Sequence, residues 1–424
     1  MESVITCDLE GRITSANTAV ESIFGYQPEE LVGQKRVSLF SPGLVALGQM
    51  PEWLKTAAEQ GEFQTQSVFL KRDGTPFTAD IRILPIFQDG QQIGFSAITH
   101  PRLDVPPETV MPETPLAAKI FPWFVITRAP FLTATVIPIF TGAAWAIAQG
   151  YAQPFSWLLF VLTLLGGIAL HIAANTFNDY FDWKSGTDPA NNEYFMPFSG
   201  GSRSIELRLI SEKNLLKVGW TALGVAFLAG LPILLARGPL LLLFGLFGAL
   251  SAYFYTAPPL RLAARKGLGE LLVGLNFGPL MAAGTVFALS GLITWDAFFV
   301  GLPAGFLVTA ILWINQFPDM ESDALTGKRN LVVILGKEDA RWGYALLLVG
   351  AFGLPVIGVA FGVLPSTALL VLLGLPLAIK AMAVLFRHYN ERALVKANST
   401  TIKMHMIAGL LLAGGLLLGS FVRF

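Results

Sequence analysis

Apolar residues are distributed unevenly along this chain. From about residue 131 onward, long apolar runs recur, and each could cross a bilayer as an α-helix. Short polar segments separate the runs. We therefore predict nine membrane-spanning helices, near residues 131–149, 155–177, 215–235, 239–257, 269–289, 296–316, 342–362, 365–386 and 405–422.

The first 103 residues follow a different pattern. Polar and apolar residues alternate over short stretches, and no run is long enough to cross a bilayer. Such alternation predicts β-strands. We expect strands over residues 4–8 and 12–17, and two hairpins whose tips are the Asp-Gly pairs 73–74 and 89–90. With a short helix over residues 19–24, this region should form a small α+β domain with an antiparallel sheet.

Several short motifs in this region resemble a PAS domain. They are Asp8-Leu9-Glu10-Gly11-Arg12-Ile13, Asn17, Phe24-Gly25-Tyr26, Glu30-Leu31-Val32-Gly33 and Lys71-Arg72-Asp73-Gly74. The resemblance implies a sensor or interaction module whose ligand or protein partner is unknown. Cys7 lies in an expected strand and outside the helical motif of flavin-linked photosensors, so no photoadduct cysteine is expected.

A proline-rich segment joins the two regions. Four prolines within residues 104–117 predict an extended linker. Residues 119–130 then approach the membrane as an expected interfacial helix. We therefore divide the chain into a PAS-like domain over residues 1–103, a linker over 104–117 and a membrane domain over 118–424.

Composition agrees with a membrane protein and excludes several other classes. The chain of 424 residues is 53% hydrophobic and 14% charged, with a mean hydropathy of +0.59, which is too apolar for an ordinary soluble protein. Its formal net charge is zero, so the charge balance does not indicate nucleic acid as a partner. The single cysteine excludes an intrachain disulfide or a thiolate cluster. At the N-terminus, no basic segment is followed by an apolar run, so we expect no cleavable signal peptide.

Lysine and arginine residues lie almost entirely on one side of the expected membrane. The loops after the second, fourth, sixth and eighth apolar runs contain Lys184, Arg203, Arg208, Lys213, Lys217, Arg261, Arg265, Lys266, Lys328, Arg329, Lys337, Arg341, Arg387, Arg392, Lys396 and Lys403. The opposite loops contain only Arg237, with Arg423 at the far terminus. Because basic loops stay in the cytoplasm, we expect a cytoplasmic (inner) membrane protein with these loops and the N-terminal domain on the cytoplasmic side.

The second apolar run ends in a concentration of carboxylates and amides, at residues 175–188. If the helix continues, Asn175, Asn178, Asp179 and Asp182 share one face, because offsets of three, four and seven residues superpose. Such side chains at the end of a membrane helix are costly unless something binds them. Hard oxygen ligands indicate Mg²⁺, which keeps room for phosphate and water.

A second acidic cluster follows the sixth run. Asn315, Asp319 and Asp323 are spaced by four residues and share a face if the segment is helical, although Pro318 should kink or break that helix. Each cluster contains an Asn followed four residues later by an Asp, on the same side of the membrane, which looks like a duplicated half-site. The alternative is that each cluster only caps a helix at the membrane surface.

Basic residues accompany both clusters. Arg203 lies in a glycine-containing loop after the first cluster, and Lys328 and Arg329 directly follow the second. Facing carboxylates, a metal ion and these cations would clamp a diphosphate, although each cation could instead be an ordinary positive-inside residue. After the fourth run, Tyr255 and Arg261 could face a substrate, or form a tyrosine belt and a rigid proline turn.

The helix count and four motifs together resemble the UbiA superfamily of membrane prenyltransferases. The motifs are Asn178-Asp179-x-x-Asp182, Asp319-x-x-x-Asp323, Tyr255-Thr256-x-Pro258-Pro259 and Gly327-Lys328-Arg329. The resemblance covers about residues 118–424. It implies a multi-pass all-α bundle of nine transmembrane helices with a lateral opening to lipid, which uses Mg²⁺ to transfer an isoprenoid from its diphosphate to an aromatic ring.

The resemblance also implies roles for individual residues. Those expected at the metal are Asn178, Asp179, Asp182, Asp188, Asn315, Asp319 and Asp323. Those expected to bind substrate are Arg203, Tyr255, Arg261, Lys328 and Arg329. Those expected to be catalytic are Asp182, Asp319, Asp323 and Lys328. The partners would be a polyprenyl diphosphate, an aromatic acceptor and membrane lipid.

One departure from the general family pattern points to the acceptor. The pattern has a further Asp four residues after Asp182, where this chain has Gly186, and Asp188 comes two residues later. The form Ser185-Gly186-Thr187-Asp188, like residues 255–269, resembles the branch that prenylates 1,4-dihydroxy-2-naphthoate in menaquinone synthesis. Prenylation of this acceptor would be accompanied by loss of its ring carboxylate.

Two alternatives remain open from the sequence. The same chemistry could act on homogentisate, 4-hydroxybenzoate, a chlorophyllide or a haem. Alternatively, the bundle could be a membrane sensor that only transmits a signal detected by the PAS-like domain. The sequence shows no kinase or cyclase output, and passive transmission does not require two acidic clusters.

Overall fold

The computed structural model describes residues 1–41, 49–110, 116–191 and 199–422. Contacts between residues divide the chain into two units. The first unit contains residues 1–125 and 204–211, and the second contains residues 126–203 and 212–424. Each unit has its own hydrophobic core.

The first unit is built on a five-stranded antiparallel sheet with the strand order β2-β1-β5-β4-β3. Its strands are β1 (Ser3–Asp8), β2 (Ile13–Ala16), β3 (Phe63–Leu70), β4 (Pro76–Gln88) and β5 (Gln91–Pro101). Both predicted hairpins are confirmed. Strands β3 and β4 pair across a turn that contains Gly74, and strands β4 and β5 pair across a turn that contains Asp89 and Gly90. All three of these turn residues have a positive φ.

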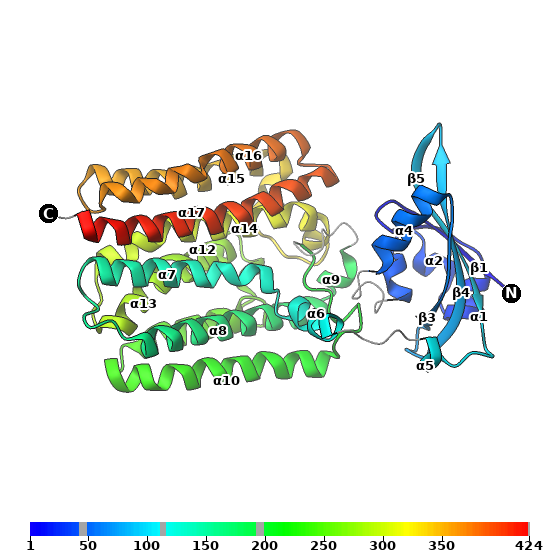
Figure 1. Cartoon of the computed structure of the whole chain (residues 1–424), viewed down its shortest axis with the longest axis horizontal. Helices are drawn as coiled ribbons and strands as arrows, with labels where there is room; N and C mark the ends of the chain where they lie inside the picture. Colours follow the sequence, from blue (N-terminus) through cyan, green and yellow to red (C-terminus); the bar gives the residue numbers. More distant parts are fainter. Residues whose placement is uncertain (42–48, 111–115, 192–198, 423–424) are drawn as a thin grey trace. The chain divides into compact units, whose positions relative to one another are not determined.

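Short helices pack against this sheet, and Figure 1 shows α4 along one of its faces. These helices are α1 (Ala19–Phe24), α2 (Pro28–Leu31), η1 (Val37–Phe40), α4 (Gln49–Gln60) and α5 (Pro107–Val110). Helix α6 (Leu116–Ile126) follows, and the second unit begins at its end. Arg208, in the later segment of the first unit, donates hydrogen bonds to the carbonyl oxygens of Lys71 and Arg72 at 3.0 and 2.8 Å. These bonds hold that segment against the turn between β3 and β4.

The second unit is a bundle of long helices that run roughly parallel or antiparallel to one another (Figure 1). Its main helices are α7 (Thr133–Ala148), α8 (Trp157–Lys184), α10 (Glu212–Arg237), α11 (Leu241–Phe254), α12 (Leu268–Leu275), α13 (Met281–Ser290), α14 (Trp295–Leu325), α15 (Leu331–Ala360), α16 (Leu375–His388) and α17 (Val395–Val422). Shorter elements extend or connect them: η2 (Ala129–Leu132), α9 (Thr187–Ala190), η3 (Leu262–Ala264), η4 (Asn276–Leu280), η5 (Ser366–Gly374) and η6 (Arg392–Leu394).

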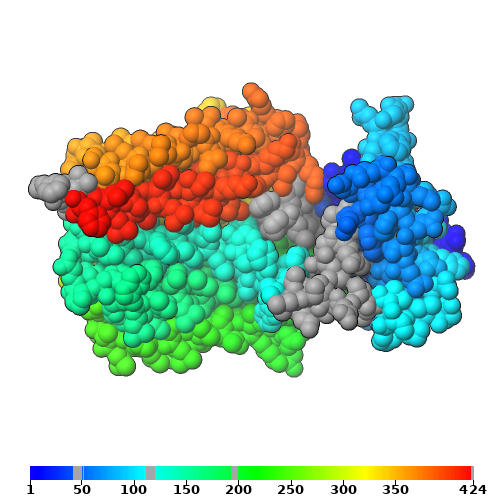
Figure 2. Space-filling model, in the orientation of Figure 1, coloured from blue at the N-terminus to red at the C-terminus, as the bar shows by residue number. Residues whose placement is uncertain are grey.

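Within the described residues, eight helical segments are long and apolar enough to cross a membrane. They match eight of the predicted spans, with α12, η4 and α13 forming one continuous segment. The remaining predicted span, near residues 239–257, contains the shorter α11. Large apolar side chains such as Trp157, Phe227 and Leu410 are exposed on α8, α10 and α17, and these helices form part of the surface that Figure 2 shows.

Two helices extend past their predicted ends at residues 177 and 316, and both extensions carry acidic residues. Helix α8 continues to Lys184, and α14 continues to Leu325. Pro318 does not break α14, which corrects the expected interruption. A proline has no N–H, so the carbonyl oxygen of Ile314 loses its helical partner. The side-chain amide of Asn398, on α17, donates to that oxygen instead, at 3.3 Å.

Helix α14 is the most deeply buried of the described spanning helices, and glycines let its neighbours approach closely. A Cβ on Gly278 of η4 would lie 2.5 Å from the Cα of Gly305, and a Cβ on Gly305 would lie 2.4 Å from the carbonyl oxygen of Gly274. Backbones at this separation leave no room for a side chain. The crossing fixes α14 against α12 and η4, and residues of all three elements line one cavity.

Candidate active site

A cavity lies between α8 and α14 in the second unit and is also lined by parts of η2, η4 and the loop at residues 199–201. The sequence-predicted site residues that line it are Asn178, Asp182, Asp188, Tyr255, Asn315, Asp319, Asp323 and Lys328. Asp179, Arg203, Arg261 and Arg329 are not among its lining residues. The structure thus brings residues of both acidic clusters to one cavity.

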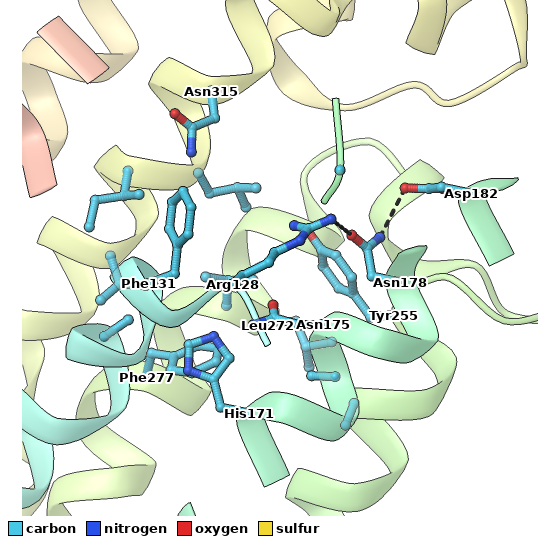
Figure 3. Close-up of a pocket in the computed structure, with 18 of the residues that line it drawn as sticks. Arg128, Phe131, His171, Asn175, Asn178, Asp182, Tyr255, Leu272, Phe277 and Asn315 are labelled. Atoms are coloured by element: carbon cyan, nitrogen blue, oxygen red, sulfur yellow. Dashed lines mark hydrogen bonds between the residues drawn. The ribbon is translucent and has the colours of Figure 1, made fainter. Parts of the chain in front are cut away.

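Helix α8 presents four polar side chains to the cavity: His171, Asn175, Asn178 and Asp182 (Figure 3). Offsets of four, three and four residues keep them on one face of the helix. This stripe differs from the predicted one, because Asp179 lies about 100° around the helix from Asn178 and faces other partners. The stripe changes from a carboxylate at Asp182 through two amides to an imidazole at His171.

Asp182 is held by its neighbours but keeps one oxygen without a partner. Asn178 Nδ2 donates to Asp182 Oδ2 at 2.9 Å and to Thr256 Oγ1 at 2.8 Å. Lys328 Nζ lies 3.4 Å from both Asp182 Oδ2 and Asp323 Oδ1. Burial lowers the pKa of the Lys328 amine, but the two carboxylates outweigh burial and hold this pKa well above its usual value. Asp182 Oδ1 is buried and has no hydrogen-bond partner among the described residues.

Arg128 is a site residue that the sequence did not suggest. It lines the cavity, and its guanidinium donates to Asn178 Oδ1 at 3.1 Å and to Asp179 Oδ1. The same Asp179 oxygen accepts the Ser202 N–H at 3.2 Å, whereas Oδ2 is buried with no partner in the described part of the chain. The position of Arg128, directly before the first membrane helix and on the side of both acidic clusters, is the signal that could have identified it.

The loop at residues 199–203 approaches the carboxylates with bare backbone. The Gly200 N–H donates to Asp319 Oδ2 at 3.1 Å. Gly201 has a φ of +74°, and a Cβ at this position would lie 2.7 Å from Asp188 Oδ2. Only glycine tolerates this conformation and this contact together. The loop therefore supplies donors and space where larger residues would fill the cavity.

Arg203, predicted to bind a diphosphate, is buried and directed at backbone. Its guanidinium donates to the carbonyl oxygens of Asp188 and Asn191, so it holds α9 and Asn191 in place. Burial raises the pKa of the Asp188 carboxyl well above its usual range, and Asp182 raises it further, against the opposing effect of Arg203. A bound cation would favour the ionised form of this carboxyl.

On α14, both carboxylate oxygens of Asp319 and of Asp323 have a partner. Asp319 Oδ1 accepts a hydrogen bond from Asn191 Nδ2 at 2.6 Å, and its other oxygen accepts from the loop backbone. Asp323 Oδ2 accepts from Asn330 Nδ2 at 2.7 Å, and Oδ1 faces Lys328. Both carboxylates are thereby fixed in orientation before any ligand binds.

Asn398 connects the proline in α14 to the site. Its Nδ2 reaches Asn315 Oδ1 at 2.8 Å as well as the carbonyl oxygen of Ile314. One side chain therefore satisfies the carbonyl that Pro318 leaves without a helical donor and also orients an amide that lines the cavity. Nothing in the sequence indicated this residue.

Backbone pairing brings Lys328 and Tyr255 to the same cavity. The Lys266 N–H donates to the Arg329 carbonyl oxygen at 2.9 Å, which joins the loop after α14 to the loop that follows α11. Lys328 and Tyr255 then line the cavity from these two loops. Arg261 and Arg329, predicted to bind substrate, contribute no lining surface.

The donor set suits a hard divalent cation such as Mg²⁺. Among the described residues, no three His, Cys, Asp or Glu side chains are close enough to hold an ion without other ligands. Mg²⁺ usually takes one or two carboxylates, and substrate phosphates and water complete its shell. The buried Asp182 Oδ1, without a hydrogen-bond partner in the described chain, is costly unless a ligand such as a metal ion contacts it. The residues therefore fit Mg²⁺ bound together with an anionic substrate.

Family models match both parts of the sequence. The sequence model of the UbiA prenyltransferase family matches residues 135–420, and that of the PAS domain matches residues 1–100. The two family resemblances predicted from motifs are therefore confirmed.

Individual relatives and solved structures agree with the family match. The chain is 28% identical over 300 residues to 1,4-dihydroxy-2-naphthoate octaprenyltransferase of Bacillus subtilis, covering 70% of this chain and 92% of the relative. It is 30% identical over 315 residues to the Haemophilus influenzae protein of the same name, covering 71% and 97%. It is 26% identical over 314 residues to 2-carboxy-1,4-naphthoquinone phytyltransferase of Synechocystis, covering 72% and 97%. A UbiA homolog from Archaeoglobus fulgidus bound to DMAPP and Mg²⁺ has the same fold, with 19% identity, a TM-score of 0.52 and coverage of 70% and 98%.

The membrane helices, the shared cavity and the family match over most of the chain lead to one conclusion. This chain is an integral membrane enzyme of the UbiA prenyltransferase family, with a PAS domain at its N-terminal end.

Proposed function

We propose that this enzyme uses Mg²⁺ to transfer a polyprenyl group from its diphosphate to 1,4-dihydroxy-2-naphthoate, in menaquinone biosynthesis. The observation that carries the proposal is a single cavity with two kinds of lining. Carboxylates, amides and Lys328 line one part, and apolar side chains such as Leu272 and Phe277 line another. The first part suits a metal diphosphate, and the second suits an isoprenoid and an aromatic ring. Two of the relatives are named as octaprenyltransferases for this acceptor.

The charged part of the cavity would hold the diphosphate. The residues proposed to hold Mg²⁺ with the phosphate oxygens are Asn178, Asp182, Asp188, Asn315, Asp319 and Asp323. When bound, Mg²⁺ supplies positive charge that stabilises the departing diphosphate. Lys328, between two carboxylates, donates to the same leaving group. Asp179 and Arg203 support the site through Arg128 and the loop backbone, and substrate binding by Arg261 and Arg329 stays a prediction.

The bonding changes follow from the two substrates. The C1–O bond of the prenyl diphosphate breaks, which gives an allylic cation and free diphosphate. The ring carbon that carries the carboxylate attacks C1, and the carboxylate leaves as CO₂, which restores the aromatic ring. The apolar walls exclude water that would capture the cation, and the ring faces of Phe131 and Phe277 can stabilise its charge.

A panel of acceptors tests the proposal. The full-length protein in liposomes receives a radiolabelled prenyl diphosphate with 1,4-dihydroxy-2-naphthoate, homogentisate or 4-hydroxybenzoate, in MgCl₂ or EDTA. We expect labelled product from the naphthoate in MgCl₂, and a rate at least about tenfold lower with the other acceptors or in EDTA. Preference for another acceptor would overturn the acceptor assignment, and transfer that EDTA does not change would overturn the metal assignment.

The prenyl donor requires its own panel. The Synechocystis relative is named as a phytyltransferase, so a phytyl group is a second candidate beside longer polyprenyl chains. Competition between phytyl diphosphate and polyprenyl diphosphates of increasing length, with the acceptor fixed, distinguishes the two. A faster reaction with phytyl diphosphate would replace the polyprenyl assignment.

We also propose that the N-terminal domain is cytoplasmic and regulates the enzyme. Its fusion to the membrane domain through a short proline-rich linker motivates this proposal. Deleting residues 1–105 should change kcat or KM, and unchanged kinetics would contradict regulation.

The orientation in the membrane has its own test. A cysteine placed after Arg237 in a Cys7→Ser background should react with a membrane-impermeant thiol reagent that is added outside the cell. Reaction only from the cytoplasmic side would reverse the assigned orientation.

A further inference from the structure

The cavity continues along α8 beyond the residues that a diphosphate needs. His171 lies seven residues before Asn178, or about 10 Å along the helix axis. It lines the cavity with Asn175, and its ring lies against Phe277 with ring centroids 4.7 Å apart. Phe131 lines the cavity nearby, as Figure 3 shows. Two aromatic rings and two uncharged polar side chains therefore meet in this part of the cavity.

One hydrogen bond favours a particular tautomer of His171. Nδ1 lies 2.8 Å from Thr135 Oγ1, and both residues are buried. Among the described residues, Nδ1 is the one hydrogen-bond partner of the Thr135 hydroxyl group. The hydroxyl proton therefore has an acceptor only if Thr135 donates it to Nδ1. In the neutral ring, Nε2 then carries the hydrogen. Nε2 has no hydrogen-bond partner within the described chain, which leaves a donor for a ligand.

Asn175 adds the complementary group. Its Nδ2 donates to the carbonyl oxygen of Thr127 at 3.2 Å, and its Oδ1 is an acceptor with no partner among the residues that the structure describes. Together with His171, it gives one donor and one acceptor, about one helical turn apart. An isoprenoid chain can pair with neither, because it carries no polar atom, and burying such groups without partners is costly. A hydroxylated aromatic ring can pair with both.

We propose that His171 and Asn175 bind the aromatic acceptor, with Phe131 and Phe277 flanking its ring. The Nε2–H of His171 donates to one oxygen substituent of the ring, and Asn175 Oδ1 accepts from a ring hydroxyl. This assignment rests on the proposed transfer to a dihydroxynaphthoate and adds the residues that select the acceptor. A donor directed at a ring oxygen favours its ionised form, which makes the ring a better nucleophile. His171 is the specificity-determining residue of this site.

Acceptor kinetics of two His171 variants test the assignment. His171→Leu removes the donor, whereas His171→Gln keeps an N–H donor. We expect the KM for 1,4-dihydroxy-2-naphthoate to rise about tenfold in His171→Leu and less in His171→Gln, with the KM for the prenyl diphosphate changed by less than about twofold. His405→Leu is the matched control, because His405 is also buried but does not line the cavity. It should change neither KM.

Acceptor analogues locate the contact. The KM of analogues that lack the 1-hydroxyl, the 4-hydroxyl or the carboxylate is measured in the wild type and in His171→Leu. The substitution should raise the KM of the analogue that lacks the contacted oxygen about tenfold less than it raises the KM of the others. If His171→Leu does not accumulate, Thr135→Val, which frees Nδ1 without altering the cavity lining, should raise the acceptor KM by a smaller factor.

Two results separate this assignment from the proposed function. An unchanged acceptor KM, or an equal rise in KM for both substrates, in the His171→Leu or Thr135→Val variant would overturn the acceptor site. A wild-type enzyme that prenylates none of the aromatic acceptors would instead overturn the proposed function.

Discussion

Helices α8 and α14 bring the same pair of residues, an Asn followed four residues later by an Asp, to one cavity, but they hold the pair differently. On α14, Asp319 and Asp323 have a partner at each oxygen. On α8, Asp182 keeps a buried oxygen with no partner in the described chain. Equal spacing therefore does not give equal roles. Helix α14 supplies carboxylates that are already oriented, and α8 supplies one that a cation can complete.

The flanking segments cause this difference. After α8, the chain turns at Gly186, and further along it the Asn191 side chain and the Gly200 N–H donate to Asp319 on α14. On α8, Asp179 contacts Arg128 and accepts the Ser202 N–H, and Asp182 contacts Lys328. The motif places the carboxylates, and the surrounding loops decide how each is used.

The largest effect is expected for Asp182→Asn. The substitution removes the charge of the carboxylate whose free oxygen we assign to Mg²⁺, so kcat should fall about 1,000-fold or more. Titration of transfer activity with MgCl₂ should also show half-saturation at a higher concentration. Activity and Mg²⁺ dependence equal to the wild type would exclude α8 from the metal site.

Arg128→Leu should have the next largest effect, mainly on stability. It leaves Asp179 buried without its cation, and breaking a buried ion pair in this way costs about 3–5 kcal/mol. The thermal unfolding midpoint of the detergent-solubilised protein should fall, and Arg128→Lys should recover part of the loss. An unchanged thermal unfolding midpoint in Arg128→Leu would show that the Arg128 cation does not contribute to the stability of the protein.

Asp319→Asn should reduce kcat less than Asp182→Asn, by about 10-fold to 100-fold. Its donors, Asn191 and Gly200, already fix the orientation of this side chain, and one amide oxygen can still accept. Asp296→Asn is the control on the same helix. Its carboxylate accepts from Trp145 and Tyr151, each at 3.0 Å, and does not line the cavity. Equal losses for Asp319→Asn and Asp182→Asn would mean that the two helices play equivalent roles.

The smallest effect is expected for Asn398→Leu. Loss of its hydrogen bonds should cost about 1–2 kcal/mol of unfolding free energy and reduce kcat about threefold. Pro318→Ala restores an N–H for the Ile314 carbonyl, so the double variant should be more stable than Asn398→Leu alone. The wild type, the two single variants and the double variant form a double-mutant cycle. If the changes in unfolding free energy are additive in this cycle, Asn398 does not compensate for the proline.

How much could be predicted from the sequence depends on how local each signal is. The fold class, the apolar helices and the PAS domain follow from run lengths and short motifs, and they are confirmed. Helical periodicity was enough to select side chains such as Asp182 and Asp319, which line the cavity. Arg128, Asn191 and Asn398 could not be found in this way, because each acts through a hydrogen bond to a residue between 50 and 128 positions away.

Helix ends and side-chain direction were the weakest points. Both acidic helices extend past their predicted ends, because the polar residues that usually end a membrane helix find partners inside the bundle. Asp179 shows the second limit. Its spacing placed it on the same stripe as Asp182, but contacts with Arg128 and Ser202 hold it outside the cavity lining. Sequence periodicity predicts which residues share a face of a helix. The residues that this face contacts depend on the tertiary structure.

The hydrogen bonds of Asn398 also impose an order on biosynthesis. Chains are made from the N-terminus, and α17 follows every other helix of the described bundle. Helix α14 therefore enters the membrane with the Ile314 carbonyl unpaired, and its donor is translated 84 residues later. A nascent chain that stalls before residue 395 would contain every carboxylate of the site but not the amide that orients Asn315, so the ribosome must reach the first turn of α17 before the active site can be complete.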